Sequence, residues 1–190
     1  MLCQEEISKI FRETGVLLEG HFLLSSGRHS SQYLQCAQAL KHPDIAARLC
    51  RDLAAKLTEK ELDLCIGPAL GGVLVAYEMG RSLGIPAIFS ERDKGKMALR
   101  RGFTIKEGDK VLVVEDVITT GGSAREVVEL VREKGGVVTE VAVLVDRSDG
   151  KASFDVPLQS LTSLAVESYT PEECPLCQQG KPVVKPGSRS

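Results

Sequence analysis

The stretch VLVVEDVITTGGS, residues 111–123, carries the residue types best suited to chemistry. An apolar run ends in the adjacent carboxylates Glu115 and Asp116, and a turn of threonines, glycines and a serine follows. Where a strand leads into a helix, the first N–H groups of the helix are unpaired and lie at the positive end of its dipole. Glycines let the backbone approach a ligand closely and hydroxyl groups add donors, so residues 119–123 are predicted to wrap a phosphate group.

The two carboxylates would repel a phosphate if they pointed toward it. Successive side chains on a strand point to opposite faces, and both acids precede the turn, so they can instead accept hydrogen bonds from sugar hydroxyls. This arrangement predicts a 5-phosphoribosyl ligand. Two other phosphate loops are excluded, because no lysine follows Gly121 and Gly122 as GxxxxGK[ST] requires, and neither VITTGG nor GPALGG fits GxGxxG. The alternative is an acidic strand end with an unoccupied glycine turn.

Two strand–turn–helix units must position this turn. The first runs through LDLCIG, PALGG, VLVAYEMGRSLG and IPAIFS, and the second through KVLVVED, VITTGG, SAREVVELVREKGG and VVTEVAVLVD. The strands are continuously apolar, which indicates burial on both faces. The segments between them are long enough for crossover helices, so we predict an α/β fold with an open, mostly parallel, twisted sheet flanked by helices. Ligands bind beyond the carboxyl ends of such strands, where loops 67–72, 90–102 and 115–123 would meet.

The N-terminal third is predicted to hold two helices and a hairpin. Apolar residues at helical spacing predict a helix over residues 4–14 and another over 43–57. Between them, residues 17–40 contain short apolar pieces around a Ser/Gly/His-rich centre. This pattern indicates short strands or a hairpin that carries a functional loop, or else an ordinary surface turn. With 190 residues, the chain is expected to form a single domain over 1–190.

The C-terminal part is predicted to add one strand at SLTSLAVESY, residues 160–169, and a frayed, flexible tail over about 181–190. Before that tail, Cys174 and Cys177 form a CxxC pair, which is half of a zinc ribbon's ligand set. We interpret it as a turn with two partly buried thiols; a disulfide or a site shared by two subunits are the alternatives. The three histidines are not spaced as a ligand set and are expected in loops or packing, with His29 a candidate substrate contact: His21, His29 and His42.

The overall charge excludes some classes of partner. There are 24 basic and 26 acidic residues, which leave a formal charge of -2, so no global basic field favours nucleic acid. The N-terminus carries acids and lacks the apolar core of a secretion signal, and no later segment is apolar enough to span a membrane. The four remaining cysteines are scattered, which suits reduced thiols in the cytoplasm. We therefore expect a cytoplasmic protein without nucleic-acid or membrane partners.

The stretch VLVVEDVITTGGS resembles the signature of type I phosphoribosyltransferases for 5-phospho-α-D-ribose 1-diphosphate (PRPP): four apolar residues, two acids, two apolar residues and T-[TA]-G-[GT]-[ST]. Other segments are similar to the orotate phosphoribosyltransferases, and this similarity extends from the first predicted helix to about Asp146. GHFLLSSGRHSSQYLQ resembles their N-terminal segment over the pyrimidine, and GPALGG resembles their diphosphate loop. VDRSDG carries Arg147 where that family has a base-binding arginine. The resemblance implies the type I fold, with residues 1–40 contributing a small N-terminal hood.

The resemblance implies a role for each matching residue. Glu115 and Asp116 would hold the ribose hydroxyls. The remaining PRPP contacts would come from Val117, Ile118, Thr119, Thr120, Gly121, Gly122 and Ser123, and from the backbone of Ala69, Leu70, Gly71 and Gly72. Orotate would be contacted by Thr119, Arg147, Tyr33 and Leu34.

An arginine suits this base, because a planar guanidinium can bind the orotate carboxylate with paired hydrogen bonds. The alternative for Arg147 is a weak surface salt bridge with Asp146 or Asp149. Two positions depart from the family pattern: Ser25 stands where lysine is frequent, and Leu70 with Gly71 where Tyr-Lys is frequent. Both departures remove a cation expected near the substrate phosphates.

The segment ERDKGKMALRRG, residues 91–102, is strongly basic and keeps neither a helical nor an alternating apolar period. It is therefore predicted to be a mobile loop, with a solvated charged face as the alternative. The resemblance implies a basic lid that reaches over the active site of the other subunit of a homodimer. Lys94 and Lys96 would contact the leaving diphosphate, with Arg92 as a helper, and stabilise its developing charge. Mg²⁺ is expected as a cofactor carried by PRPP rather than by a dedicated cluster of side chains.

These observations together predict an orotate phosphoribosyltransferase activity, which forms orotidine 5′-phosphate and diphosphate in pyrimidine synthesis. Two alternatives share the PRPP loop. One is a phosphoribosyltransferase for a purine base, from which Arg147 and the SSGRHSSQY segment would distinguish this chain. The other is a non-catalytic, PRPP-binding regulator, which should carry a helix-turn-helix or a basic face, and the sequence has neither.

Overall fold

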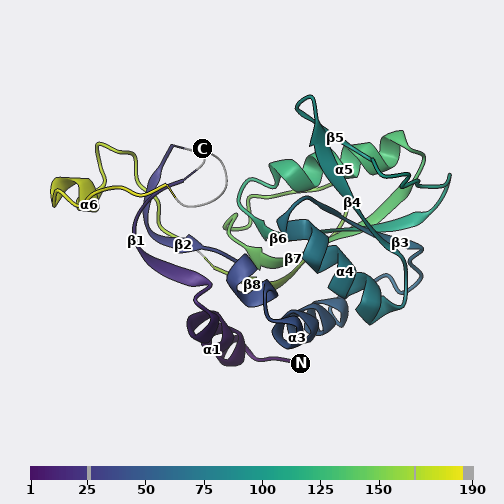
Figure 1. The fold of residues 1–190 in the computed structure, drawn as a ribbon, viewed down its shortest axis with the longest axis horizontal. Helices are drawn as coiled ribbons and strands as arrows, with labels where there is room; N and C mark the ends of the chain where they lie inside the picture. The colour runs from purple at the N-terminus through teal and green to yellow at the C-terminus, as the bar shows by residue number, and fades with distance from the viewer. Residues whose placement is uncertain (25–26, 165, 186–190) are drawn as a thin grey trace.

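A six-stranded sheet forms the centre of the molecule (Figure 1). This computed structural model describes residues 1–24, 27–164 and 166–185, so the departure at Ser25 lies outside the described residues. The strand order is β5-β4-β3-β6-β7-β8, and all neighbours are parallel except the antiparallel pair β4 and β5. The strands are β3 (Leu64–Pro68), β4 (Ala87–Asp93), β5 (Lys96–Ala98), β6 (Lys110–Ile118), β7 (Val137–Asp146) and β8 (Leu158–Ser163). The predicted α/β fold with a mostly parallel sheet is confirmed.

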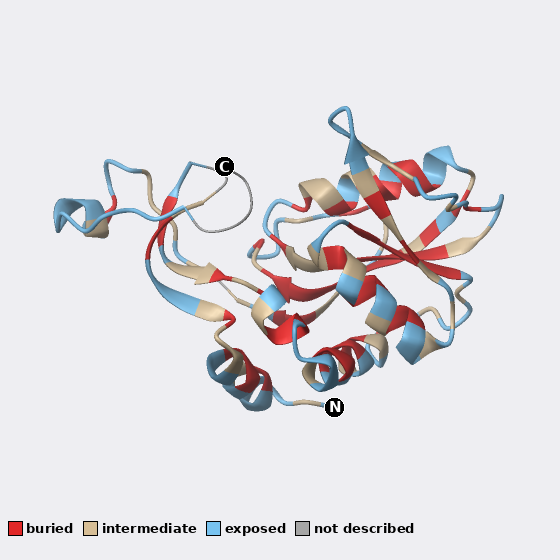
Figure 2. Ribbon diagram, viewed as in Figure 1, coloured by how far each residue is buried: buried red, intermediate tan, exposed pale blue. Residues whose placement is uncertain are grey.

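Helices cover both faces of this sheet, as Figure 1 shows. On one face, α3 (Pro43–Ala54) and α4 (Gly71–Leu83) pack in a core that includes Leu112 and Val114 of β6. On the other face, α5 (Gly122–Glu133) packs with Val111 and Val113 of the same strand. Alternate side chains of β6 therefore pack in two separate hydrophobic cores, one on each face of the sheet. Figure 2 shows the central strands buried between them, as their unbroken apolar sequences predict.

The two strand–helix–strand units run in opposite directions from the middle of the sheet. From β3 the chain passes through α4 to β4 on one side, and from β6 it passes through α5 to β7 on the other side. The boundary between β3 and β6 is thus the point where the strand order reverses. Ligands bind in open α/β sheets at the carboxyl ends of the strands that flank such a point.

The N-terminal segment forms a helix and a separate two-stranded sheet. Helix α1 (Gln4–Thr14) is followed by the antiparallel hairpin of β1 (Leu17–Leu23) and β2 (His29–Leu34), so the predicted helix and hairpin are confirmed. A short helix, α2 (Ala37–Leu40), leads to α3. Helix α3 ends at Ala54 rather than at residue 57, because the chain turns there toward a hydrogen-bonded network on β7.

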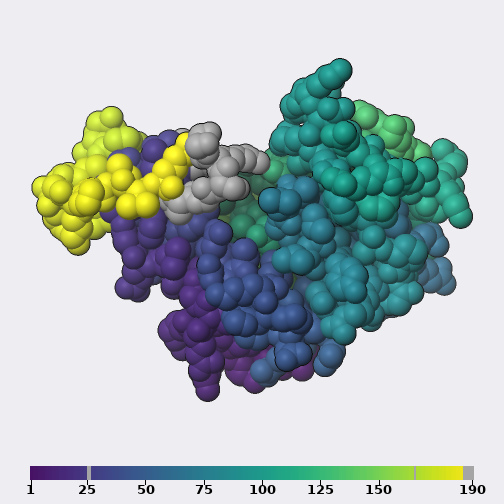
Figure 3. All heavy atoms as spheres, in the orientation of Figure 1, coloured from purple at the N-terminus to yellow at the C-terminus, as the bar shows by residue number. Residues whose placement is uncertain are grey.

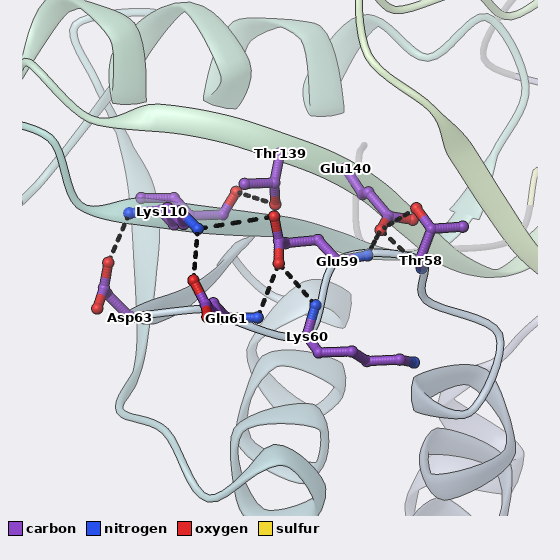
Figure 4. A network of polar contacts seen from close by, with 9 residues as sticks. Thr58, Glu59, Lys60, Glu61, Asp63, Lys110, Thr139 and Glu140 are labelled. Carbon is purple, nitrogen blue, oxygen red and sulfur yellow. Dashed lines mark hydrogen bonds and ion pairs between the residues drawn. The ribbon is translucent and has the colours of Figure 1, made fainter.

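That network is centred on Glu140 of β7, which is 1% exposed. Its Oε1 atom accepts hydrogen bonds from the backbone N–H of Thr58 (2.8 Å), the Thr58 hydroxyl (2.8 Å) and the backbone N–H of Glu59 (2.6 Å) (Figure 4). Nearby, Lys110 at the start of β6 pairs with Glu61 at 3.1 Å. These contacts fix residues 58–63 to the amino ends of β6 and β7. They lie away from the carboxyl ends, so we assign them to stability.

The C-terminal segment returns to the hairpin. Strand β8 ends at Ser163, earlier than predicted, because its last partner, Asp146, is also the last residue of β7. The chain then pairs Tyr169 with His29 on β2, forms the short helix α6 (Pro175–Gln178) and pairs Val184 with Phe22 on β1. Figure 1 shows this segment beside β1 and β2.

Within the predicted flexible tail, Val184 pairs with the hairpin. The backbone N–H of Val184 donates to the His21 carbonyl at 2.8 Å, and that of Leu23 donates to the Val184 carbonyl at 2.9 Å. The prediction for 186–190 falls outside the described residues. No helix in the described part of the chain is long and apolar enough to cross a membrane.

Candidate active site

The turn between β6 and α5 has the geometry of an anion-binding loop. Gly121 is the N-cap of α5 with φ 74°, a left-handed conformation that favours glycine. A Cβ atom on Gly121 would lie 2.8 Å from Cζ of Phe154, so a side chain is also excluded by space. Thr119 and Thr120 are exposed at the front of the turn. The unpaired N–H groups of the first helical turn and these hydroxyls are therefore available to a phosphate.

Arg125 holds this loop in place. Its guanidinium donates to the backbone carbonyls of Thr120 (3.3 Å) and Ser153 (3.2 Å), and it lies 5.5 Å from the ring centre of Phe154. Sequence reasoning missed this positioning role, because Arg125 lies on a helix while its three partners come from a turn and from the segment after β7. No local pattern in the sequence could have indicated it.

A second loop, at the carboxyl end of β3, lies beside the first. Residues Ala69 and Leu70 are joined by a cis peptide bond and lead into α4. The loop folds back tightly, since a Cβ atom on Gly67 would lie 2.3 Å from the carbonyl oxygen of Gly72. A Cβ atom on Gly71 would lie 2.5 Å from Oδ2 of Asp116. Glycine at 71 thus leaves room for the Asp116 carboxylate, and any side chain there would displace it.

Asp116 lies at the junction of these two loops. Burial raises the pKa of its carboxyl group, and hydrogen bonds from the backbone N–H groups of Val117 and Asp116 itself oppose that shift. Burial also raises the pKa of Tyr33 on β2, and the nearby charge of Asp116 adds to the effect. The hairpin therefore brings Tyr33 to the acidic end of β6. Glu115 is half-buried on the same strand.

Arg147 completes this neighbourhood from the end of β7. Its backbone N–H donates to the Ile118 carbonyl at 2.9 Å, which ties it to β6. Burial lowers the pKa of its guanidinium, while the neighbouring Tyr33 and Cys36 oppose that shift. Within the described part of the chain, its buried Nε–H has no hydrogen-bond partner. A buried donor without a partner costs about 1–3 kcal/mol, so an acceptor from a ligand would stabilise it.

The alternative of a surface salt bridge for Arg147 is wrong among the described residues. Oδ1 of Asp146 accepts instead from the Ser148 N–H at 2.7 Å, and Asp149 pairs with Lys151 at 3.4 Å. The guanidinium thus remains available beside the loops.

Three predicted contacts have side chains that point into the cores. Leu34 is 3% exposed and Ile118 is 1% exposed, and each packs in a hydrophobic cluster. Val117 is half-buried and packs against the cluster that contains Leu34. These residues can therefore face a ligand with their backbone only, whereas Tyr33 has a half-buried side chain with a polar end.

The basic segment, which was predicted to be a mobile loop, has regular secondary structure and forms a β-hairpin over most of its length. Strand β4 continues to Asp93, turns at Lys94 (φ 50°) and Gly95 (φ 86°), and returns as β5. Positive φ at both central residues is the geometry of a two-residue hairpin turn, for which glycine is the local signal. In Figure 3 the hairpin stands out from the surface of the body.

The cations of this hairpin differ in their contacts. Arg92 is held within its own chain by an ion pair with Glu126 of α5 at 2.8 Å and by the Gly95 carbonyl at 2.8 Å. Lys94 and Lys96 are exposed, and no ion pair joins them to the described residues. The two lysines, rather than Arg92, are therefore free to meet an anion.

The fold and the two loops at the sheet switch point form the arrangement expected for a site that takes a phosphorylated sugar. A family model described as "Phosphoribosyl transferase domain" matches residues 37–157, which include both loops and Arg147. The chain belongs to the phosphoribosyl transferase family.

The relatives place the chain more narrowly. It is 55% identical to the orotate phosphoribosyltransferase of Desulforamulus reducens over 186 residues, which cover 98% of this chain and 97% of the relative. It superposes on the orotate phosphoribosyltransferase of Aeropyrum pernix with a TM-score of 0.70 and 28% identity, over 83% of this chain and 93% of that one. The Mycobacterium tuberculosis H37Rv orotate phosphoribosyltransferase, in complex with PRPP, matches with a TM-score of 0.64 and 31% identity, over 84% and 95%. The branch of the family is that of the orotate phosphoribosyltransferases, as the resemblance predicted.

Proposed function

We propose that this chain transfers the 5-phosphoribosyl group of PRPP to orotate and so produces orotidine 5′-phosphate and diphosphate in pyrimidine biosynthesis. The observation that carries the choice of base is Arg147, whose half-buried guanidinium lies near Tyr33 and has, within the described residues, a buried Nε–H without a hydrogen-bond partner. Orotate is a planar base with a carboxylate, which a guanidinium binds with charge-assisted hydrogen bonds. Purine bases lack that carboxylate.

The sugar diphosphate would occupy the two loops. Residues 119–123 bind the 5-phosphate at the N-terminus of α5, and Glu115 with Asp116 accepts hydrogen bonds from the ribose hydroxyls. The diphosphate lies against the backbone of residues 69–72. Because Asp116 contacts the Gly71 position, the ribose and diphosphate subsites adjoin each other.

Catalysis would rest on positioning and charge stabilisation. The attacking atom is a ring nitrogen of an already acidic pyrimidine, so the reaction needs no protein nucleophile. Arg147 and Tyr33 orient the base, and the carboxylates hold the ribose so that its anomeric carbon faces that nitrogen. Cations near the leaving diphosphate lower the barrier, because negative charge develops there.

Mg²⁺ fits this site as an ion carried by the substrate. Half-buried carboxylate oxygens stand next to the diphosphate loop, since Asp116 contacts Gly71, and hard oxygen ligands suit this ion. Two acids are too few for an all-protein cage, whereas diphosphate and water supply the remaining ligands. When bound, the ion neutralises part of the charge that the leaving group gains.

In a homodimer, Lys94 and Lys96 of one subunit would supply the other subunit's site with the cations that the departures from the family pattern remove. Leu70, Leu74 and Tyr77 are 79%, 46% and 64% exposed and follow the helical spacing of one face of α4. Exposed apolar faces of this kind mark protein interfaces, and this one begins at the diphosphate loop. We therefore place the partner subunit on α4, with Lys94 and Lys96 of each hairpin serving the site of the other subunit. All six cysteines are free thiols, which supports a cytoplasmic location.

The activity is tested by the fall in orotate absorbance on mixing with the purified protein. The fall should require both PRPP and Mg²⁺, and turnover of adenine or xanthine without turnover of orotate would refute the choice of base. Arg147→Ala should raise the KM for orotate by about tenfold or more, because a charge-assisted hydrogen bond contributes about 1.5–3 kcal/mol. The matched control is Arg132→Ala on α5, whose exposed ion pair with Asp155 contributes little.

The shared site is tested by mixing two subunits that are each impaired by a different substitution. A Lys96→Ala subunit lacks the hairpin cation, and an Asp116→Asn subunit lacks the ribose contact. Mixed dimers contain one intact site, so part of the activity should return. Adding Leu74→Glu to both subunits should abolish the dimer in light scattering and also the recovery. Recovery by monomers, or none by stable mixed dimers, would contradict the exchange of hairpins.

A further inference from the structure

Four side chains that no part of the proposed reaction uses converge beside the hairpin. His21 lies on β1 and His29 on β2, while Cys174 is the N-cap of the short helix α6 and Cys177 lies within that helix, far along the chain. Their potential ligand atoms all lie within 4.8 Å of one another. Three of the four residues are buried, with His21 5%, His29 7% and Cys174 0% exposed. The sequence predicted loop or packing roles for the histidines and did not indicate this convergence.

The distances match one metal ion at the centre of the four side chains. Nε2 of His21 lies 2.9 Å from Nδ1 of His29, 3.5 Å from Sγ of Cys174 and 3.7 Å from Sγ of Cys177. Sγ of Cys177 lies 3.2 Å from Nδ1 of His29. Tetrahedral zinc with bonds of about 2.0–2.1 Å to nitrogen and 2.3 Å to sulfur holds neighbouring ligand atoms about 3.3–3.8 Å apart. Small movements of the two imidazoles would complete that geometry.

We propose that His21, His29, Cys174 and Cys177 bind one zinc ion, which fixes the C-terminal segment to the β1–β2 hairpin. Two thiolates and two imidazoles are a ligand set typical of structural zinc. Thiolate ligands do not suit Mg²⁺, so this site is distinct from the substrate's ion.

The surroundings of His21 favour metal ligation. Its Nδ1 atom lies 2.9 Å from the Lys181 carbonyl, so Nδ1 carries the proton and donates it to that oxygen. The lone pair of the neutral imidazole is then on Nε2, which faces the other three side chains. Histidine ligands of zinc regularly donate their second N–H to a carbonyl or carboxylate, which fixes the ring and its tautomer.

The C-terminal segment also needs an anchor other than apolar packing. Within its described part, 166–185, Cys174 is the one buried residue, and α6 buries none of its own. Backbone hydrogen bonds join it to the hairpin at Tyr169 and at Val184, on opposite edges. Small units without an apolar core are commonly held by metals or disulfides. A zinc ion between these two attachment points would hold the segment against both strands.

The test is the metal content of the full-length chain, purified without a histidine tag. Mass spectrometry with inductively coupled plasma should find about one zinc per chain in the wild type. The double variant Cys174→Ser/Cys177→Ser should lose it. Cys3→Ser and His42→Ala should retain it, because both residues lie outside the group. A wild type without stoichiometric zinc, or a double variant that keeps it, would overturn the proposal.

A second measurement on the wild type alone covers the case in which the double variant does not fold. Replacing zinc by Co²⁺ should produce the visible absorption of a tetrahedral site together with thiolate-to-cobalt charge transfer. A chelator should lower the unfolding temperature of the zinc-loaded protein, since a metal bound to the native state stabilises it. A Cys174–Cys177 disulfide in the intact mass of freshly purified protein would refute the site. Neither readout depends on orotate turnover, so failure here leaves the proposed function unaffected.

Discussion

Gly121→Ala tests whether the phosphate loop depends on one backbone conformation and on its contact with Phe154. Alanine at φ 74° costs about 1–2 kcal/mol, because the Cβ atom approaches the backbone. The new Cβ atom would also lie 2.8 Å from the Phe154 ring, and such overpacking costs about 1–3 kcal/mol more. The free energy of unfolding should therefore fall by about 2–5 kcal/mol.

Gly84 provides the matched control for this substitution. It has φ 72° at the C-terminus of α4, and nothing lies within 4 Å of its Cβ position. Gly84→Ala should therefore cost only the conformational term of about 1–2 kcal/mol. Adding Phe154→Leu to Gly121→Ala should recover most of the difference between the two alanine variants. Urea unfolding of all three proteins measures these terms.

The same substitution should weaken binding of the sugar diphosphate. Losing one hydrogen bond from a loop N–H to a charged phosphate costs about 1.5–3 kcal/mol, so the KM for PRPP should rise by about tenfold or more. The KM for PRPP in Gly84→Ala should not change. If both variants lose equal stability and both keep the wild-type KM for PRPP, the assignment of this loop is refuted.

Two further predictions concern buried carboxylates. Burial raises the pKa of Asp116, so the native state holds this proton more tightly than the unfolded state, and its contribution to stability falls as pH rises above the ordinary carboxylate range. Asp116→Asn should consequently be more stable than the wild type at neutral pH, and this gain in stability should fade at acidic pH. Its KM for PRPP should nevertheless rise. A variant without the pH-dependent gain in stability would contradict the burial argument. Glu140→Ala leaves the donors of Thr58 and Glu59 unpaired and should lower the free energy of unfolding by about 2–4 kcal/mol without changing kcat. Glu61→Ala, which removes only an exposed pair with Lys110, is its control and should cost less than about 1 kcal/mol.

The parts of the site that sequence could predict are those encoded locally. Residues 111–123 contain the end of a strand, the two acids, the glycine turn and the start of a helix in direct succession. Each of these parts has a recognisable local sequence pattern. The parallel sheet followed from unbroken apolar strands separated by helices. Arg147 could be placed only through the resemblance of VDRSDG to the family's base-binding segment, and the structure shows that it directly follows β7.

Contacts between distant segments could not be predicted in the same way. The approach of Asp116 to Gly71 depends on how β3 and β6 pair. Arg125 contacts Phe154 only once α5 has packed against the sheet. The zinc ligands are separated by most of the chain, and their spacing has meaning only once the C-terminal segment has returned to the hairpin. The β4–β5 hairpin was missed for another reason, since its alternating pattern is too short to stand out from its charges.

The return of the C-terminal segment also protects the hairpin from other chains. A two-stranded sheet exposes unpaired N–H and C=O groups along both outer edges, where strands of another molecule can add. Here Tyr169 occupies a position on the edge of β2 and Val184 one on the edge of β1. The chain thus pairs one position on each of these edges with its own backbone, which lowers the risk of strand exchange and aggregation there.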